Sequence, residues 1–489
     1  MLRIKNYKDF KYFLQDKLDT KGVIFGVGVT SFMRFFPSLF VKNFKIICFK
    51  DSKDNQVLEK YLDEIFILKK RRPTLKLPFT NTNNILRNKT VQNYIKSHKG
   101  KKYLFLYKAD KNITKAIKGL NVKLIANRAH LNKLFENKVN FRRQLIRAGL
   151  QPVPGQIMKF SEFQKPEYDF DFFVNKYGPK FVLQLPDFRL GGGKGTLFID
   201  SKRKFNEFKK KIESGIYKRK ELQTINITKF IEGKSCSIAC CATKYGTLVS
   251  GIQQQIMDIP QVIAKKKGNG VFVGHVFGLK FNPSINKQAR EMGEKFGKYM
   301  YSKGYKGIFG LDIIINQKEN KVYPIECNAR YTGAFPMISM LCMKYKIIPL
   351  DFFHFLEFLK IPYKINVKEL NKKYQKQIKG SHLILSNTRD YSIEVKNELE
   401  VGTYRYQKNK IKYLSDNIFY DDLKTANDFV LVDGVPKKGQ KIKKWSRTAR
   451  IVHVLFNADI LKANDKELKD KYLNIVYAIY KAMFGKKQP

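Results

Sequence analysis

The sequence predicts a mixed fold, α/β in the first part of the chain and α+β beyond it, with a small β-rich region at the C-terminal end. Three observations support this prediction: apolar runs alternate with helical patterns near the N-terminus, a long hairpin lies past the middle, and short strand-like runs separated by glycine turns fill the last part. The 489 residues suffice for about two to four domains with large cores.

The composition limits the class of protein. Hydrophobic residues make up 43% of the chain, and no apolar run approaches the roughly 20 residues of a membrane span, so we expect no membrane partner. The start of the chain has no apolar leader, and the six cysteines show no disulfide or zinc spacing, which predicts a cytoplasmic protein. The formal charge of +53 favours anionic small molecules. Because the lysines are spread along the whole chain, we do not expect nucleic acid as a specific ligand.

The first part of the chain predicts a parallel α/β domain. Gly26 and Gly28 follow the first strand and Asp51 follows the second, but the third glycine of a dinucleotide-binding loop is missing. A turn that ends the strand therefore explains these glycines better than a nicotinamide dinucleotide site. The expected strands cover residues 22–27, 44–49, 65–68, 103–107 and 122–125.

A single helix is expected over residues 129–149, where leucines recur at helical spacing and Gly149 suits the C-terminal end. Pro152 and Pro154 then break the pattern. Lys138 lies within this helix, where an exposed lysine without a specific role is the simple interpretation.

Two strands expected over residues 181–185 and 195–200 enclose a glycine-rich loop. Consecutive glycines let backbone N–H groups approach an anion closely, and the lysine that follows adds a positive charge. The loop returns into a strand instead of a helix, so it differs from a phosphate-binding Walker loop and predicts a flap over a phosphate chain. A hairpin loop without function is the alternative. The residues concerned are Gly191, Gly192, Gly193 and Lys194.

The segment 302–337 carries the strongest signal for chemistry. Strands are expected over 308–315 and 321–330, joined by a polar turn near Glu319 that would place Asp312 across from Glu326. Alternation along the strands puts one set of side chains inward and the other on the opposite face. The inward set is Phe309, Leu311, Ile313, Ile315, Tyr323, Ile325 and Cys327; the opposite set is Asp312, Glu326, Asn328 and Arg330.

The polar face of this hairpin predicts a magnesium site. Carboxylates in a cross-strand pair lie roughly 4.5–5.5 Å apart and repel unless a cation bridges them. Mg²⁺ takes one or two carboxylates together with phosphate oxygens, and the Asn328 carbonyl adds a neutral ligand. Arg330 could hold an anion beside the metal. An ordinary amphipathic hairpin with a solvated charged face is the alternative.

The remaining segments complete the pattern. Strands are expected over 226–231 and 235–242, and a glycine-rich basic piece over 265–278 contains His275, which we interpret as structural. A helix begins near Pro283. The last part of the chain has short strand-like runs and a final helix over 472–484, with no residues to which we assign chemistry.

Taken in order, these elements resemble the ATP-grasp superfamily of carboxylate–amine ligases. The resemblance covers about residues 121–350 and is most specific in the stretch GIFGLDIII…YPIECNAR. It implies a Rossmann-like pre-ATP-grasp domain over 1–128, a two-lobed ATP-grasp domain over 129–360 and a β-rich C-terminal domain over 361–489. Biotin carboxylases share this domain order.

The resemblance also implies roles for individual residues. Asp312, Glu326 and Asn328 match the Mg²⁺ ligands, and Arg330 matches the arginine that faces the carboxylate or acyl phosphate. Lys138 matches the first lysine that contacts ATP. The other expected ATP contacts are Gln184, Gly191, Gly192, Gly193, Lys194, Thr228, Lys229, Phe230 and Ile231, and Lys194 is also expected in catalysis.

The chain departs from the family pattern at three positions. Gln184 stands where a lysine usually reaches the phosphates, and Lys194 could replace its charge. Thr228 and Ser235 stand where the hinge usually carries acids.

The function implied by the resemblance is an ATP- and Mg²⁺-dependent ligase that activates a carboxylate as an acyl phosphate and couples it to an amine, of the amino-acid or peptide type. One alternative is a biotin carboxylase-like enzyme that uses bicarbonate, but residues 331–335 lack the acid that handles bicarbonate. The other is a catalytically inactive basic binding protein. The expected partners are a small-molecule carboxylate and amine; the oligomeric state stays open, with a homodimer as one candidate.

Overall fold

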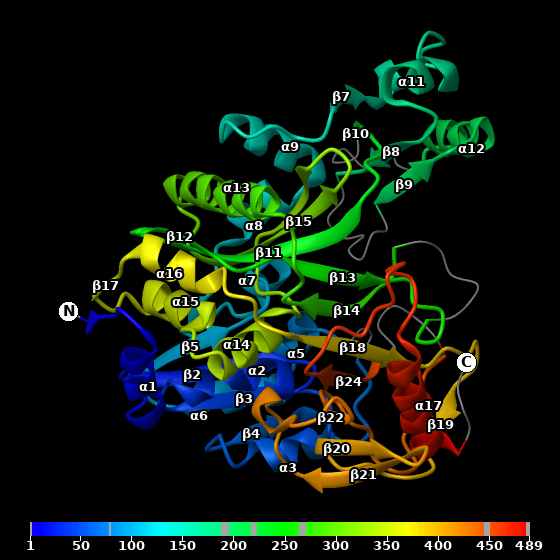
Figure 1. Cartoon of the computed structure of the whole chain (residues 1–489). Helices are drawn as coiled ribbons and strands as arrows, with labels where there is room; N and C mark the ends of the chain where they lie inside the picture. The colour runs from blue at the N-terminus through cyan, green and yellow to red at the C-terminus, as the bar shows by residue number, and fades with distance from the viewer. Residues whose placement is uncertain are drawn as a thin grey trace.

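Three large sheets organise the protein, as Figure 1 shows. The structure is a computed structural model that describes residues 2–77, 80–186, 195–216, 223–263, 270–444 and 450–485. The combination of a parallel sheet with antiparallel sheets confirms the predicted α/β and α+β class.

The N-terminal sheet is parallel and has the strand order β4-β3-β2-β5-β6. Its strands are apolar along most of their length because helices or neighbouring elements cover both faces. The strands are β2 (Gly22–Gly28), β3 (Phe44–Cys48), β4 (Ile65–Ile67), β5 (Lys101–Phe105) and β6 (Lys123–Ile125). The helices are α1 (Tyr7–Gln15), α2 (Phe32–Phe35), α3 (Asp54–Leu58), α4 (Leu68–Arg71), α5 (Thr82–Arg87), α6 (Lys89–Ser97) and α7 (Lys111–Ala116), with the 3₁₀ turn η1 (Phe36–Leu39).

A small lobe stands away from the rest of the molecule at the upper right of Figure 1. Its antiparallel sheet has the order β7-β10-β8-β9, and a core of closely packed phenylalanines such as Phe173, Phe181 and Phe205 lies under it. The elements are β7 (Gly155–Lys159), α10 (Phe160–Phe163), α11 (Phe170–Tyr177), β8 (Phe181–Gln184), β9 (Thr196–Ile199), α12 (Lys202–Glu213) and β10 (Thr224–Lys229).

The third sheet has 11 strands and runs through the middle of the molecule. Its path is β16-β15-β11-β13-β14-β18-β24-β22-β20-β21, and β12 pairs with β11 beside this path. The strands before β18 are β11 (Lys234–Thr243), β12 (Gly246–Val249), β13 (Gln253–Met257), β14 (Phe272–Phe277), β15 (Gly307–Asn316) and β16 (Lys321–Asn328). Those from β18 on are β18 (Gly380–Ser386), β20 (Gly402–Gln407), β21 (Lys410–Ser415), β22 (Asp428–Val432) and β24 (Arg450–Phe456).

The pairing of β14 with β18 makes the C-terminal strands a direct extension of the central sheet. The division at residues 128/129 and 360/361 stays a proposal. Helices α13 and α15 pack against strands of the central part, and the remaining elements connect or cover the sheet. These elements are α13 (Pro283–Ser302), α14 (Phe335–Lys344), α15 (Leu350–Leu359), α16 (Val367–Tyr374), α17 (Asp470–Phe484), the 3₁₀ turn η4 (Tyr420–Asp422) and the short strands β1 (Leu2–Arg3), β17 (Tyr363–Lys364), β19 (Ile393–Glu394) and β23 (Lys441–Ile442).

The single helix predicted over 129–149 is wrong. The chain forms two helices, α8 (Ala129–Glu136) and α9 (Lys138–Arg147), with Asn137 between them in an extended conformation. The Asn137 side chain accepts a hydrogen bond from the Asn140 backbone N–H at 3.0 Å and so caps α9. The break places Glu136 at the end of one helix and Lys138 at the start of the next.

None of the helices in the described part of the chain is long and apolar enough to cross a membrane.

Candidate active site

The carboxylate hairpin forms as predicted from β15 and β16, and Asp312 pairs directly with Glu326. The prediction that Tyr323 and Ile325 point inward with Cys327 is wrong. A β-bulge leaves Ile325 unpaired, because Asp312 pairs with Glu326 whereas Ile313 already pairs with Pro324. Tyr323 therefore joins a small apolar cluster on the other side of the strand, with Val153 and Ile231.

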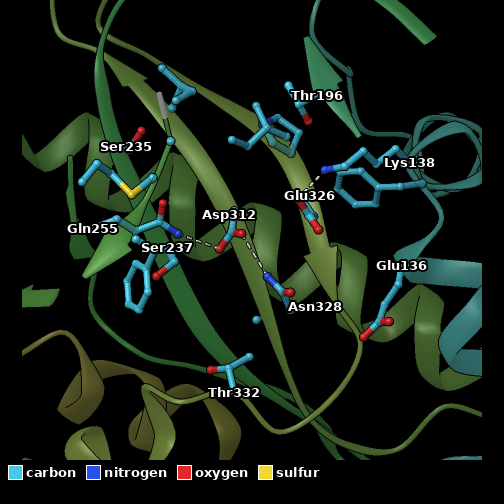
Figure 2. Close-up of a pocket in the computed structure, with 18 of the residues that line it drawn as sticks. Glu136, Lys138, Thr196, Ser235, Ser237, Gln255, Asp312, Glu326, Asn328 and Thr332 are labelled. Carbon is cyan, nitrogen blue, oxygen red and sulfur yellow. Dashed lines mark hydrogen bonds and ion pairs between the residues drawn. The ribbon is translucent and has the colours of Figure 1, made fainter. Parts of the chain in front are cut away.

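Asp312 occupies the centre of the site in Figure 2. Asn328 Nδ2 donates to Asp312 Oδ2 at 2.9 Å, and Gln255 Nε2 donates to Asp312 Oδ1 at 3.0 Å. Desolvation and the neighbouring Glu326 carboxylate raise the pKa of Asp312 to about 7. The donor set of two carboxylates and one amide fits a divalent cation, whose charge would relieve this repulsion.

Lys138 reaches the hairpin from the first turn of α9 (Figure 2). Its Nζ lies 2.5 Å from Glu326 Oε2, and the lysine side chain is only 13% exposed. A residue predicted to contact the nucleotide and a residue predicted to bind the metal thus form an ion pair.

Arg330 is held by two partners. Its Nη2 donates to Asn328 Oδ1 at 2.5 Å, and its Nε lies 3.1 Å from Glu136 Oε1. Glu136, which is 9% exposed, also forms an ion pair with Lys108. The sequence analysis missed Glu136 and Lys108, because no motif marks a carboxylate whose partners are distant in sequence.

The predicted nucleotide residues of the small lobe lie on two adjacent strands. Gln184 on β8 pairs with Asn226 on β10, and Asn226 Nδ2 donates to Gln184 Oε1 at 2.8 Å. The buried Asn226 Oδ1 has no hydrogen-bond partner among the described residues. An unpaired buried acceptor at the cavity wall fits a donor from a ligand such as an adenine amino group.

The predicted hinge, residues 228–231, begins within the last two residues of β10. Thr228 is buried and pairs with Val182, whereas the Lys229 side chain is exposed and its backbone N–H donates to the Pro154 carbonyl at 2.8 Å. The Phe230 ring packs edge-on against Phe198. Ile231 lies in the apolar cluster with Tyr323. Gly191, Gly192, Gly193 and Lys194 lie outside the described residues, and their roles stay predictions.

A cavity of about 680 Å³ joins these residues. It lies between the small lobe and the large sheet, with Gln184, Thr228 and Ile231 on one side and Asp312, Glu326, Asn328, Arg330, Lys138 and Glu136 on the other. It also extends to residues that the sequence analysis did not assign to a site, including His382, His453 and Arg450.

Comparison with known proteins finds similarity in the central part of the chain. Residues 136–334 match the family model of an ATP-grasp domain. The butirosin acyl-carrier protein–L-glutamate ligase of Niallia circulans is 25% identical over 201 residues, which make up 40% of this chain and 43% of that protein. The match thus spans less than half the length of this curated relative.

Solved structures share the fold over most of the chain. The biotin carboxylase domain of the Hydrogenobacter thermophilus 2-oxoglutarate carboxylase, solved with MgADP, ADP and bicarbonate, has a TM-score of 0.59 and 14% identity, and the match covers 90% of this chain and 86% of that one. Phosphoribosylamine–glycine ligase from Thermotoga maritima has a TM-score of 0.56 and 11% identity, with 92% and 94% covered. At these identities the likeness describes the fold alone.

Proposed function

We propose that residues 136–334, which match the family model of an ATP-grasp domain, make this chain an ATP- and Mg²⁺-dependent ligase. It activates a carboxylate as an acyl phosphate and couples the acyl group to an amine. The observation that carries the proposal is the direct pairing of Asp312 with Glu326, beside Asn328 and Arg330, in a cavity that also contains the strands of the small lobe.

The proposed site divides the binding of MgATP between the two walls of the cavity. Asp312, Glu326 and Asn328 would hold Mg²⁺. Among the described residues no cluster of three or more His, Cys, Asp or Glu side chains could hold a metal by itself, so phosphate oxygens would supply further ligands. Gln184, Asn226 and residues 228–231 would contact the nucleotide, with Lys138 near its phosphates. When bound, Mg²⁺ neutralises charge on the phosphates during transfer.

Arg330 is the proposed catalytic residue of the carboxylate side. Its guanidinium holds the substrate carboxylate, and later the acyl phosphate, through charge-assisted hydrogen bonds. Glu136 and Asn328 fix the direction of this guanidinium at 3.1 Å and 2.5 Å. Fixed positions matter because phosphoryl transfer depends mainly on alignment and electrostatic stabilisation.

The acyl group passes to an external nucleophile in this proposal. All six cysteines are buried, so none of them offers an exposed thiol as an acyl acceptor. The name of the Niallia circulans relative, a ligase acting on an acyl-carrier protein and L-glutamate, makes amino acids the first substrates to test.

The test measures ADP release from ATP and Mg²⁺ with pools of small carboxylic acids and amino acids. We expect one combination of acid and amine to stimulate release, and Glu326→Gln to reduce the stimulated rate by about a hundredfold or more. Arg203→Gln, on the exposed surface of α12, serves as the control and should keep the rate. Equal stimulation in wild type and Glu326→Gln would contradict the proposed metal site, and no stimulation by any combination would contradict the ligase proposal.

A further inference from the structure

One face of the large sheet carries a row of polar side chains that leads from the proposed metal site into the C-terminal strands. Directly paired residues of antiparallel strands point to the same face, so the register identifies the members of the row. Glu326, Asp312, Ser237 and Gln253 are successive partners across β16, β15, β11 and β13; Gln255, His275 and His382 are successive partners across β13, β14 and β18.

Side-chain contacts join these residues. Gln255 donates to Asp312 at 3.0 Å. Ser237 Oγ lies 3.4 Å from His275 Nε2, and His275 Nδ1 lies 2.9 Å from His382 Nε2. These contacts form two runs, Gln255 with Asp312 and Ser237 with His275 and His382, and the direct pairing of Ser237 with Asp312 and of Gln255 with His275 places the two runs side by side.

The next strand, β24, adds a third histidine and an arginine. His453 pairs with Ile384, and its ring stacks on His382 with 5.6 Å between the ring centroids. A β-bulge follows, because Leu385 pairs with Val452 whereas Ser386 pairs with Arg450. The extra residue turns Arg450 to the face that carries His382 and His453.

We name His275, His382 and His453 the histidine row. These side chains are 5%, 1% and 1% exposed. Burial lowers the pKa of His275 and of His453 to about 3 and also lowers the pKa of His382, so the three rings are neutral at neutral pH. Each neutral imidazole offers one donor and one acceptor.

Part of this hydrogen-bonding capacity is unused. Among the described residues, His382 Nδ1 and both ring nitrogens of His453 have no hydrogen-bond partner; His453 Nε2 lies 3.4 Å from Asp433 Oδ2 without hydrogen-bond geometry. Buried polar groups without partners destabilise a fold, so their persistence beside a cavity is explained if a ligand completes them.

The histidine row and Arg450 line the same cavity of about 680 Å³ as Asp312 and Glu326. Apolar side chains of Met257, Phe272 and Ile384 also line this cavity. The far end of the cavity thus combines neutral hydrogen-bonding groups, an apolar wall and the exposed cation Arg450.

We propose that this far end binds the acceptor amine, and that the acceptor is an amino acid or a similar amine with a free carboxylate. The inference rests on the proposed ligase function. Arg450 pairs with the carboxylate of the acceptor. The unpaired nitrogens of the histidine row form hydrogen bonds with its polar groups, each N–H as a donor and each unprotonated nitrogen as an acceptor. Phe272 and Ile384 contact its side chain. The reacting amine then lies on the same sheet face as Asp312.

The test measures the thermal shift of the protein without ATP, in millimolar L-amino acids and in the matching amino-acid amides, which lack the carboxylate. At least one amino acid is expected to raise the melting temperature, and its amide is not. Arg450→Gln and His453→Phe should weaken the binding of that amino acid about tenfold or more. Arg450 is exposed, so Arg450→Gln does not threaten folding, and Arg203→Gln is the matched control.

The outcomes separate this inference from the ligase proposal. Binding that Arg450→Gln and His453→Phe remove, but that Glu326→Gln keeps, supports an acceptor site distinct from the metal site. No stabilisation by any amino acid, equal stabilisation by the amides, or unchanged binding in Arg450→Gln overturns the inference. None of these results decides the ligase proposal, which is tested separately by ADP release in Glu326→Gln.

Discussion

The Lys138 ammonium lies 2.5 Å from the Glu326 carboxylate, so the side chains proposed to contact ATP and Mg²⁺ form an ion pair with each other. Asp312, the other member of the carboxylate pair, contacts only neutral donors, Asn328 and Gln255, among the hydrogen bonds described for it. A divalent cation would therefore compete with Lys138 for Glu326, and the released ammonium would be available to the phosphates.

This competition predicts opposite effects of Lys138→Met on the two ligands. Mg²⁺ or Mn²⁺ alone should bind more tightly, because the carboxylate pair loses its counter-charge. The KM for ATP should rise about tenfold or more, because a charge-assisted contact is lost. Metal titration by calorimetry and steady-state kinetics measure the two effects. Lys204→Met, on the surface of α12, is the control, and weaker binding of the free metal to Lys138→Met would contradict the account.

Glu136 is a positioning residue for Arg330. Glu136→Gln keeps the shape of the side chain but removes the charge that holds Arg330 and Lys108. We expect kcat to fall about ten- to hundredfold, because a misdirected guanidinium no longer aligns the carboxylate, with little change in the KM for ATP. A role confined to stability would instead lower the melting temperature and leave kcat of the folded enzyme unchanged.

Local patterns in the sequence identified the hairpin, because its strands are adjacent and their alternation is fixed by period two. The bulge at Ile325 escaped prediction because it depends on how Tyr323 packs against Val153 and Ile231, which come from distant segments. Helix α8 ends at Glu136 because the next residue, Asn137, caps the N-terminus of α9 and does not continue α8.

The histidine row could not be predicted from the sequence for a different reason. His275 was interpreted as structural, and the structure does bury it. Its contact with His382 depends on the pairing of β14 with β18, whose paired residues lie more than a hundred positions apart in the sequence. The identity of a single residue does not indicate which residue of a distant strand it will pair with.

Buried neutral histidines predict acid sensitivity of the fold. The pKa of His354 is lowered from 6.5 to about 3 by burial, like those of His275 and His453. The unfolded chain therefore binds protons first as the pH falls from 6.5 toward 3, and the free energy of unfolding should decrease by about 1.4 kcal/mol per pH unit for each such histidine. Urea unfolding at several pH values measures this slope.

A single substitution tests whether buried histidines cause this pH dependence of the free energy of unfolding. His354→Gln should reduce the pH dependence by up to about 1.4 kcal/mol per pH unit, because one depressed titration is removed. His130→Gln, at an exposed position, should leave it unchanged. An unaltered slope in His354→Gln would mean that other groups cause the acid sensitivity.

Gly155, at the junction of α9 and the small lobe, has no room for a larger side chain. A Cβ at this position would lie 2.2 Å from the Ile227 carbonyl oxygen, and the Gly155 carbonyl accepts a hydrogen bond from Arg142. Gly155→Ala should therefore lower the free energy of unfolding by about 1–3 kcal/mol. Gly251→Ala, whose Cβ would meet its nearest atom at 3.4 Å, is the matched control. Denaturant unfolding compares the two, and equal stabilities would contradict the steric argument.

The central claim is that the substrate carboxylate attacks ATP to form an acyl phosphate beside Asp312 and Glu326. The most direct test supplies the stimulating acid with a heavy oxygen isotope in its carboxylate and analyses the phosphate released with ADP. The account predicts that one labelled oxygen per turnover appears in the inorganic phosphate and that Glu326→Gln loses this transfer together with ADP release. Turnover without label in the phosphate, or label in AMP instead, would contradict the acyl-phosphate mechanism.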